Sequence, residues 1–341
     1  MNPDAIIECV PNFSEGTDAG KVKQIIAAMQ VEGVRLLDWS LDSAHNRSVV
    51  TIAGSPAAVV EAAVRSVGVA AQLIDLTLQT GVHPRIGAAD VVPFVPVSGI
   101  SLAECAMLAR QAGLQIWRRY GVPVYFYGAA AARPDRVQLE DVRRGQFEGL
   151  REAALRDTAR RPDVGGPALH ATAGASAVGA RSFLIAYNIY LEQLSVSEYS
   201  QNHRGSNVSS INKDNEQQGI ELQLDSPPLP ADVSVARAIA RDVRASGGGM
   251  HGIKAIGVVA NGRAQVSMNI TDFRMSPMRQ VHAAVEQLAH RYGVRASDGE
   301  LIGLIPEEAY EPDADWLRQI PGFDPADKVL ERRLHSPIAW P

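Results

Sequence analysis

The chain has 341 residues, enough for about two domains with a sizeable core. Its 33 Lys and Arg against 38 Asp and Glu give a net charge of -5, which argues against broad attraction to nucleic acid or anionic membranes. The start, MNPDAIIECV, carries an acid where a secretory signal carries basic residues, and no apolar run approaches the roughly 20 residues of a membrane helix. We therefore expect a cytoplasmic protein in which Cys9 and Cys105 are buried thiols.

The first half of the chain alternates strand-like and helix-like segments. Apolar residues at 6–10 predict a strand, and apolar residues at helical spacing from Val22 to Met29 predict a helix. The following segments are predicted as strands at 34–41 and 47–54, a helix from Ser55-Pro56 to Ile74, a strand at 91–97, a helix at 101–121 and a strand at 122–128. This succession begins with the order βαββαβ.

The second half repeats this order. A predicted strand at 181–191 is followed by a helix at 233–246, two strands within 253–270 and a helix at 276–293. Asn261-Gly262, between the two strands, is a strong hairpin signal. We therefore predict an α/β (α+β) fold of two stacked βαββαβ subdomains, with mixed sheets and a ligand crevice between them.

The predicted boundaries place the first subdomain at 1–180, the second at 181–310 and a C-terminal extension at 311–341. Residues 192–231 are rich in Ser, Asn, Gln and Pro and show little apolar periodicity. This composition predicts a polar insert after the first strand of the second subdomain. The extension has apolar clusters around Trp316 and Trp340, which are suited to docking on the body of the protein.

The segment TGVHPRIGAADVVPFVPV places His83 directly before Pro84, just ahead of a predicted buried strand. A residue before proline is pushed out of the helical region, so the backbone at His83 is extended and its direction is set. This suits a catalytic base, although a loop histidine capped by a carbonyl group is the commoner case for one residue taken alone.

Two turns between predicted elements carry short polar side chains. PNFSEG contains Asn12, Ser14 and Glu15 beside the start of a helix, where amide donors favour an anion or a polar edge. Ordinary helix capping explains that turn equally well. DSAHNRSVVT joins two strands and carries Asp42, His45, Asn46 and Arg47. Because polar residues are common in turns, neither segment identifies a site by itself.

The segment GGPALHATAGASAVGARSFLIAYN begins with Gly165 and Gly166 and reaches Gly174 before a predicted strand. Small residues let a flat ligand approach the backbone closely, whereas the alternative is a plain glycine-rich linker. GxGxxG, GxxxxGK[ST], GxSxG and HExxH are absent from the sequence, which argues against dinucleotide, P-loop, serine-hydrolase and zinc-protease sites. No metal site is predicted.

Taken together, these segments resemble the formiminotransferase family, which includes the transferase half of formimidoyltransferase-cyclodeaminase. The matching motifs run in family order from Glu8 to Pro306: ECVPNFSEG, HNRSVVT, HPRIGAADVVPFVPV, GVPVYFYG, TAGASAVGARSFLIAYNI, QVSMNITDF and ELIGLIP. Several motifs in order are far more specific than any one of them. The resemblance implies two α/β subdomains with a folate-binding crevice between them and, usually, a homodimer.

The resemblance also implies roles for particular residues. The catalytic histidine of the family's His-Pro-Arg motif falls on His83, and the folate-binding stretch falls on 165–174. The expected substrate-binding and folate-binding residues are Asn12, Ser14, Glu15, Asp42, Asn46, Arg47, Arg85, Asp90, Gly165, Gly166, His170, Thr172, Ala173 and Gly174. Relatives usually have Phe-Gly-Pro and His-Pro-Thr-Ala-Gly where this chain has VGG and HATAG, which puts the wall of the folate site in doubt.

The implied reaction moves a formimidoyl group from N-formimidoyl-L-glutamate to N5 of tetrahydrofolate, the co-substrate, without a metal. The donor is an amidinium cation and needs a carboxylate more than an oxyanion hole. The candidate carboxylates are Asp38, Asp42, Asp90 and Glu15. A neutral imidazole near pH 7 can take the N5 proton and return it to the departing nitrogen, which fits His83. Arg47 and Arg85 are the nearest motif arginines for substrate carboxylates.

Two other functions stay open at this point. Transfer of formyl rather than formimidoyl, between formylglutamate and 5-formyltetrahydrofolate, belongs to the same enzyme class. The other alternative is a folate-binding protein that has lost catalysis, with the insert serving a partner, although His83 and Arg85 weigh against it. Because no cyclodeaminase half follows in this sequence, we expect any coupled deamination to occur on a separate cyclodeaminase.

Overall fold

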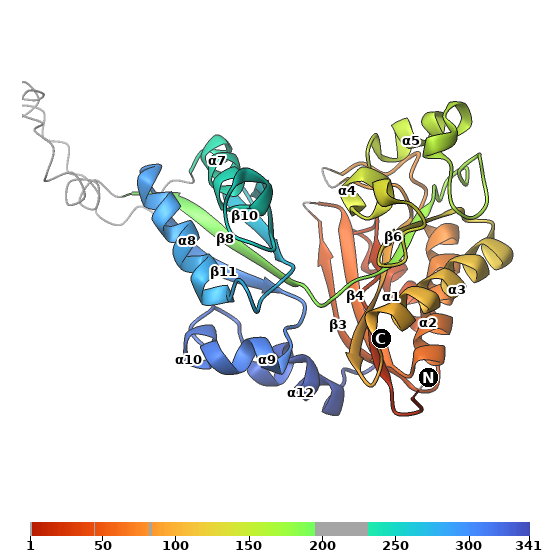
Figure 1. Ribbon diagram of the computed structural model, residues 1–341, viewed down its shortest axis with the longest axis horizontal. Coiled ribbons are helices and arrows are strands. Elements are labelled where there is room, and N and C mark those ends of the chain that lie inside the picture. The colour runs from red at the N-terminus through yellow and green to blue at the C-terminus, as the bar shows by residue number, and fades with distance from the viewer. Residues whose placement is uncertain (1, 44, 82–83, 195–230) are drawn as a thin grey trace, which may run out of the picture. The chain divides into compact units, whose positions relative to one another are not determined.

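The structure is a computed structural model that describes residues 2–43, 45–81, 84–194 and 231–341. The chain divides into two compact units, each built around a sheet of its own (Figure 1). Unit 1 contains the chain up to Phe183 together with Gly303–Glu307 and Asp324–Pro341, and unit 2 contains Leu184–Ile302 and Glu308–Phe323. The predicted fold class, mixed helices and strands with two sheets, is confirmed.

Unit 1 is built on a seven-stranded mixed sheet. Its strands are β1 (Ile6–Cys9), β2 (Asn12–Phe13), β3 (Val34–Asp42), β4 (Arg47–Gly54), β5 (Ala89–Ser98), β6 (Val124–Gly128) and β7 (Ser176–Ala180). The order is β1-β4-β2-β5-β7-β6, with β3 paired to β4 and β1 also paired to β5. β7 runs parallel to β5 and β6, whereas β1 to β4 pair antiparallel with their neighbours. β5 therefore lies in the interior of the sheet.

Three long helices pack on one face of this sheet: α1 (Ala19–Ala28), α2 (Pro56–Leu73) and α3 (Leu102–Tyr120) (Figure 1). Their apolar residues and those of the inner strands, including the buried thiols Cys9 and Cys105, form one continuous core. Ser101 and Glu104 form the expected capping box at the start of α3. The short helices α4 (Leu139–Val142) and α5 (Gln146–Arg156) follow β6 in the chain.

Unit 2 has the predicted chain order βαββαβ. Its elements are β8 (Ile185–Gln193), α7 (Val233–Val243), β9 (Ile253–Ala260), β10 (Arg263–Ile270), α8 (Met278–Arg291) and β11 (Val294–Ile302). The strand order is β11-β8-β10-β9, and every neighbouring pair is antiparallel. The expectation of a mixed sheet thus holds for unit 1 and is corrected for unit 2. β8 and β9, joined through α7, run in the same direction, but β10 is inserted between them.

Unit 1 is more elaborate than the predicted repeat. The short strand β2 is added after β1, and α3, β6 and β7 extend the order beyond β5. The insert predicted at 192–231 falls between the end of β8 at Gln193 and the start of α7 at Val233, and its residues 195–230 lie outside the described residues. Both features leave the predicted core elements in their expected sequence order.

The C-terminal segment contributes short helices to both units. They are α9 (Glu307–Tyr310), α10 (Ala314–Leu317), α11 (Pro325–Lys328) and α12 (Leu330–His335). Trp316 of α10 packs edge-on against the Tyr187 ring in unit 2, and Trp340 packs against the core of unit 1. Single turns of 3-10 helix occur at Pro134–Arg136, Thr158–Arg160, Ala245–Gly247 and Glu311–Asp313. Among the described residues, no helix has the length and apolar character needed to cross a membrane.

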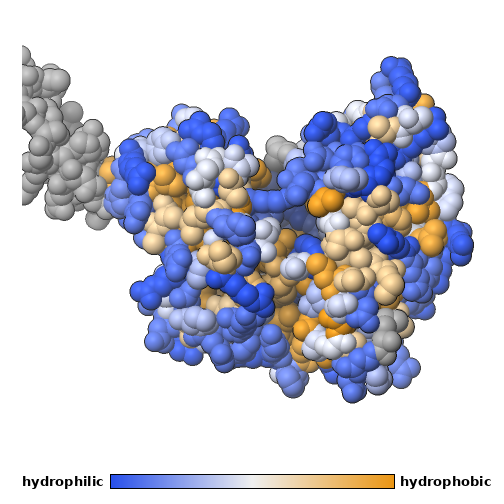
Figure 2. Space-filling view, viewed as in Figure 1, coloured by the Kyte–Doolittle hydropathy of each residue, from blue (hydrophilic) through white to orange (hydrophobic). Residues whose placement is uncertain are grey.

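Most of the surface in Figure 2 is hydrophilic, with smaller hydrophobic areas on both units. The outer side of α3 contributes Met107, Leu114 and Trp117, whose exposed fractions are 60%, 43% and 38%. Isolated apolar side chains on a surface are normal in soluble domains. The polar residues singled out in the sequence lie instead in the loops at the ends of the unit 1 strands.

Candidate active site

The loop between α2 and β5 meets the glycine-rich loop that precedes β7. The backbone N–H of Leu76 donates to the Thr172 carbonyl at 2.9 Å, and the N–H of Ala88 donates to the Ala173 carbonyl at 2.9 Å. The first loop carries Arg85, and the second is the stretch expected to bind folate. Unit 1 therefore brings together two segments that are far apart in the sequence.

Two glycines allow this close approach. A Cβ atom on Gly174 would lie 2.2 Å from the carbonyl oxygen of Ile86, and one on Gly87 would lie 2.1 Å from that of Ala175. Gly174 also has a φ of 69°, in the left-handed region that favours glycine. A side chain at either position would push the two loops apart.

The glycine-rich loop closes in a tight turn at His170. The backbones of His170 and Gly174 exchange two hydrogen bonds, and Nδ1 of His170 accepts from the Ala173 N–H at 3.0 Å. Because Nδ1 is an acceptor, the proton of a neutral His170 imidazole lies on Nε2. His170 thus keeps a ring donor at Nε2, while Thr172 and Ala173 contribute their backbone groups to the loop contact.

Gly165 and Gly166 adopt positive φ angles of 78° and 86°. A Cβ atom on Gly165 would lie 2.6 Å from the Trp117 ring of α3, and one on Gly166 would lie 2.9 Å from Pro162. Backbone conformation and packing within unit 1 therefore account for both glycines. The VGG sequence, which differs from that of the relatives, therefore fits the contacts that Trp117 and Pro162 make with these glycines.

The PNFSEG segment, expected to be a turn, contains the short strand β2 and packs on the loop before β5. Ser14 donates from its hydroxyl to the Gly87 carbonyl at 2.7 Å and from its N–H to the Ala88 carbonyl at 2.9 Å. Asn12 donates from Nδ2 to the Val10 carbonyl at 2.7 Å. Both side chains are buried. The predicted polar turn is thus held in place by backbone groups and presents its remaining polar atoms from a fixed position.

Glu15 is engaged by the start of α1. Its Oε1 accepts hydrogen bonds from the Thr17 N–H at 2.9 Å, the Thr17 hydroxyl at 2.8 Å and the Asp18 N–H at 3.0 Å. Its Oε2 pairs with Nζ of Lys21 at 3.2 Å. Burial opposes ionisation of Glu15, but the N–H groups of Asp18 and Thr17 outweigh it and lower the pKa of this carboxyl. Glu15 therefore caps the turn.

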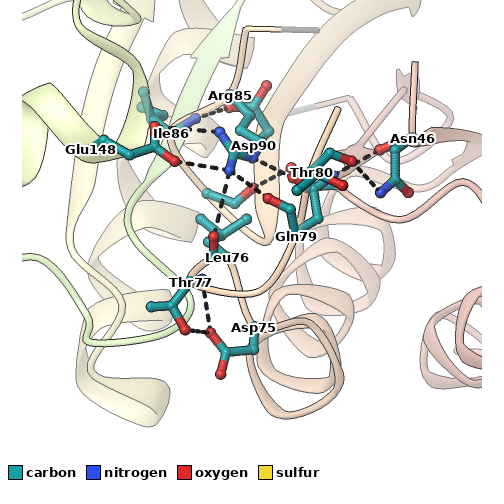
Figure 3. A network of polar contacts seen from close by, with 12 residues as sticks. Asn46, Asp75, Leu76, Thr77, Gln79, Thr80, Arg85, Ile86, Asp90 and Glu148 are labelled. Carbon is teal, nitrogen blue, oxygen red and sulfur yellow. Dashed lines mark hydrogen bonds and ion pairs between the residues drawn. The ribbon is translucent and has the colours of Figure 1, made fainter. Parts of the chain in front are cut away.

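Asn46 ties three predicted segments together. Its Oδ1 accepts from the Gly16 N–H at 2.9 Å. Its Nδ2 donates to the Thr80 carbonyl at 2.7 Å (Figure 3). Its own carbonyl accepts from Nε2 of Gln79 at 3.1 Å. Asn46 has a φ of 49°, a conformation that asparagine tolerates better than most residues. Asn46 therefore links the turn after β2, the β3–β4 turn and the loop before β5 through hydrogen bonds.

Asp42 and His45 form a dyad in the β3–β4 turn. Nδ1 of His45 lies 2.5 Å from Oδ2 of Asp42, and the His45 N–H donates to Oδ1 at 3.0 Å. The carboxylate orients the imidazole and favours a proton on Nδ1. In the sequence, His45 stands out only as one polar residue of this turn and is not among the expected site residues. The Asp-x-x-His spacing across a turn was the available signal.

Arg85 is buried, and its guanidinium is surrounded by acceptors of the same chain (Figure 3). Nη2 donates to Oε1 of Glu148 at 3.0 Å and to the Gln79 carbonyl at 2.9 Å. Nη1 donates to Oε2 of Glu148 at 3.4 Å, and Nε donates to Oε1 of Gln79. The Arg85 carbonyl accepts from the Phe147 N–H at 2.8 Å. Arg85, expected to bind a substrate carboxylate, thus joins its loop to α5.

Asp90 is buried at the start of β5 and pairs with an arginine that sequence analysis did not single out. Its Oδ1 accepts from the Ile86 N–H at 2.8 Å, and its Oδ2 forms an ion pair with Nη2 of Arg143. Arg143 follows α4, and its Nε is buried without a hydrogen-bond partner among the described residues. In the sequence, Arg143 stands in a charged RRG turn that resembles any solvated surface turn.

Arg47 begins β4 and differs from the other two arginines. Its guanidinium forms no hydrogen bond or ion pair with any residue that the structure describes, and its Nε is buried. Burial lowers the pKa of Arg47 to about 10, and the positive charge of Arg143 acts in the same direction. The negative charges of Asp90 and Asp42 oppose this shift without cancelling it. Arg47 therefore carries a charge that the surrounding protein does not fully balance.

A small pocket of about 210 Å³, including space open to solvent, lies at this convergence. Its lining residues are Asn12, Phe13, Ser14, His45, Asn46, Arg47, Arg85 and Asp90. Among the described candidates, Glu15, Asp42 and the residues of 165–174 do not line it. Cations, an imidazole and a carboxylate in one pocket can hold an anionic group and move a proton. His83 lies outside the described residues, between Gly81 and Pro84.

The fold and the pocket define an α/β protein whose first unit gathers polar and charged side chains around a small pocket. Residues 6–181 match the formiminotransferase domain, N-terminal subdomain, and residues 228–332 match the formiminotransferase domain. The chain therefore belongs to the formiminotransferase family. This confirms the resemblance found in the sequence motifs.

Relatives with assigned names match nearly the whole chain. It is 38% identical to glutamate formimidoyltransferase of Streptococcus pyogenes serotype M1, over 96% of this chain and 98% of that protein. It is 36% identical to the protein of the same name from Thermoplasma acidophilum, over 97% of this chain and 98% of that one. Formimidoyltransferase-cyclodeaminase of Dictyostelium discoideum is 34% identical over 96% of this chain, which covers 56% of that protein.

Proposed function

We propose that this protein is a glutamate formimidoyltransferase, which transfers the formimidoyl group of N-formimidoyl-L-glutamate to N5 of tetrahydrofolate. The products are 5-formimidoyltetrahydrofolate and L-glutamate. The observation that carries the proposal is the match at 36–38% identity, over nearly the full length of both chains, to proteins named for this activity. The gathering of the motif residues around one pocket of unit 1 supports it.

The reaction needs a base that becomes an acid. N5 of tetrahydrofolate attacks the amidinium carbon, and the new C–N bond leaves a proton on N5. We assign His83 to take this proton and to donate it to the glutamate nitrogen as the old C–N bond breaks. A neutral imidazole has a pKa suited to both steps near pH 7. We place tetrahydrofolate, as a co-substrate, at the stretch 165–174, where His170 offers its Nε2 donor.

Among the four candidate carboxylates, Asp42 is the one we assign to the amidinium. Glu15 accepts from the Asp18 N–H in the turn before α1, and Asp90 is buried in an ion pair with Arg143. Asp42 is half exposed and bonded to His45, a residue that lines the pocket. It can thus face a cationic donor without giving up a buried counter-charge. Asp38, on β3, is the next candidate.

Replacement of His83 tests the catalytic assignment. His83→Ala should lower kcat by about 10²- to 10⁴-fold while tetrahydrofolate still binds, because a positioned acid–base group contributes about this much. His251→Ala is the matched control, since His251 is an exposed histidine of unit 2. A near-normal kcat in purified, folded His83→Ala would remove His83 from the proposed mechanism.

The choice of donor tests the reaction itself. Formimidoylglutamate should exceed formylglutamate by roughly 10- to 150-fold in kcat/KM, because the neutral formyl group leaves the carboxylate poorly paired and a hydrogen bond to a charged group contributes about 1.5–3 kcal/mol. A preference for formylglutamate would support formyl transfer instead. Folate binding without turnover of either donor would support a non-catalytic folate-binding protein.

The same proposal includes a homodimer, which the family resemblance implies. Sedimentation velocity of the purified protein at micromolar concentration should give twice the mass of one chain. A single species at 36.6 kDa would show that one chain forms the whole protein. The measurement is independent of the activity assays above.

A further inference from the structure

The pocket of unit 1 contains an imbalance of charge. Asp90, the buried carboxylate of its lining, is already paired with Arg143. Asp42 is half exposed and bonded to His45. Arg47 has no hydrogen bond or ion pair within the described chain, although its Nε is buried. One positive charge at this pocket therefore lacks a contacting partner among the residues that the structure describes.

A buried charge without a partner destabilises a folded protein, so its presence needs an explanation. Repulsion from Arg143 adds to this penalty and helps burial to lower the pKa of Arg47 to about 10. An anion at this point would remove both penalties.

We propose that Arg47 and Arg143 together bind a carboxylate of the glutamyl donor, and that Asp90 holds Arg143 in place for this contact. The identity of the ligand rests on the proposed function, whereas the anion-binding character rests on the pocket alone. Planar guanidinium groups match carboxylates through paired hydrogen bonds. Arg47 is thereby a binding residue, and Arg143 joins it from a turn that has no recognisable motif.

Arg85 has a different task in this arrangement. It donates to both carboxylate oxygens of Glu148, and its carbonyl accepts from the Phe147 N–H. These contacts fasten the start of α5, and with it the preceding turn that carries Arg143, to the loop before β5. Arg85 is therefore a positioning residue, which acts on the donor through Arg143.

Two donors separate carboxylate binding from the chemistry. Formimidoylglutamate carries the carboxylates, whereas formamidine presents the same amidinium group without them. The preference for formimidoylglutamate, as the ratio of the two kcat/KM values, should fall about 10- to 150-fold in Arg47→Met and in Arg143→Met, as expected for the loss of a hydrogen bond between charged groups. Arg144→Met is the matched control, because Arg144 is the exposed neighbour that pairs with Asp141.

Stability measurements distinguish a binding role from a structural one. Arg47→Met should keep or raise the melting temperature, because it removes a partly buried charge that has no partner among the described residues. Arg47→Lys, which keeps the charge but loses the planar fork, should give a smaller fall in donor preference. An unchanged preference in both Arg47 variants would overturn the proposal, and so would a fall of equal size in Arg144→Met.

Binding of L-glutamate separates failure of this inference from failure of the proposed function. Calorimetry with L-glutamate as the probe should show binding to the unmodified protein and about 10- to 150-fold weaker binding to Arg47→Met. If the protein turns over no donor but binds L-glutamate in this manner, the function fails and the carboxylate site stands. If donors are turned over and both variants bind L-glutamate equally, the function stands and the carboxylate site fails.

Discussion

The two units pair their arginines in different ways. In unit 2, Glu192 accepts from Arg263 at 2.7 Å and from Arg295 at 2.6 Å. The Arg263 guanidinium also lies over the Tyr190 ring, 4.4 Å from its centroid. Each arginine of this network reaches a carboxylate, and the network is partly exposed to water. The charges of this network are balanced by residues of the protein itself, so the network needs no ligand.

In unit 1, Arg143 reaches Asp90, but Arg47 reaches no described carboxylate. An unpartnered Nε alone does not make this difference, because Arg295 in unit 2 has one as well. What differs is that the whole guanidinium of Arg47 lacks a contacting partner within the described part of the chain. The comparison teaches that arginines in a pocket must be judged by the acceptors they already have, since a satisfied arginine supports the fold and an unsatisfied one can bind an anion.

Removing the carboxylate from each network should give the largest difference between the units. Asp90→Asn should lower the free energy of unfolding by about 3–5 kcal/mol, because it leaves Arg143 buried without its counter-charge. Glu192→Gln should lower it by about 1 kcal/mol or less, because Arg263 and Arg295 can be solvated. Urea unfolding of both variants measures the two losses. Losses of equal size would show that the networks do not differ in burial.

The pH dependence of stability should have opposite signs in the two units. Burial raises the pKa of Glu8 in β1 to about 7, with nearby Arg181 opposing the shift and Glu331 adding to it. In unit 2, burial lowers the pKa of His282, although Glu286 opposes the shift. Neutral Glu8 is therefore favoured in folded unit 1, and neutral His282 in folded unit 2.

For Glu8 the unfolded chain loses its proton near pH 4.5 and the folded chain near pH 7. The stabilisation by the protonated carboxyl is thus complete below pH 4.5 and lost as pH rises to about 7, a change of about 3 kcal/mol. Unit 2 should instead lose stability as pH falls below about 6.5, because unfolded His282 takes up a proton more readily. Glu8→Gln should abolish the first slope in urea unfolding between pH 5 and 8, and an unchanged slope would contradict the assignment.

A double-mutant cycle sharpens the difference between a positioning pair and a surface pair. Arg85→Met and Glu148→Gln break the same contact, so their effects on donor preference should be non-additive, with a coupling of about 1 kcal/mol. The exposed pair Arg274 and Glu308 of unit 2 is the matched control, and its cycle should show no coupling in donor preference. Additive effects of Arg85→Met and Glu148→Gln would show that the Arg85–Glu148 contact does not position Arg143.

The smallest effect is expected from the insert, which occurs in unit 2 alone. Replacing 195–230 by a short linker should change the free energy of unfolding by less than about 1 kcal/mol, because loop closure depends only weakly on length and the insert is polar in sequence. Thermal unfolding and sedimentation of the shortened protein provide the measurement. A large fall in melting temperature, or a change in oligomeric state, would assign a structural role to these residues.

Much of the fold could be predicted because its signals are local. The capping box at Ser101 and Glu104 was placed correctly from sequence alone. The hairpin at Asn261-Gly262 was also correct, since it depends on a positive φ that few residues adopt. The antiparallel order of the second sheet was missed. β10 can pair with β9 alone, or it can lie between β9 and β8 and pair with both. The order of the elements along the chain is the same in both cases, so the sequence does not distinguish the two sheets.

The sequence by itself determined the family, through motifs kept in order, and the residue types that gather at the pocket. Only the tertiary structure decided which of those residues are already paired. Arg85 meets Glu148, and Asp90 meets Arg143, across long stretches of chain. An acceptor can satisfy an arginine however far away it lies in the sequence. The residues that flank Arg85 and Arg47 in the sequence therefore suit substrate binding equally well. Their different acceptors exist only once the loops have packed together.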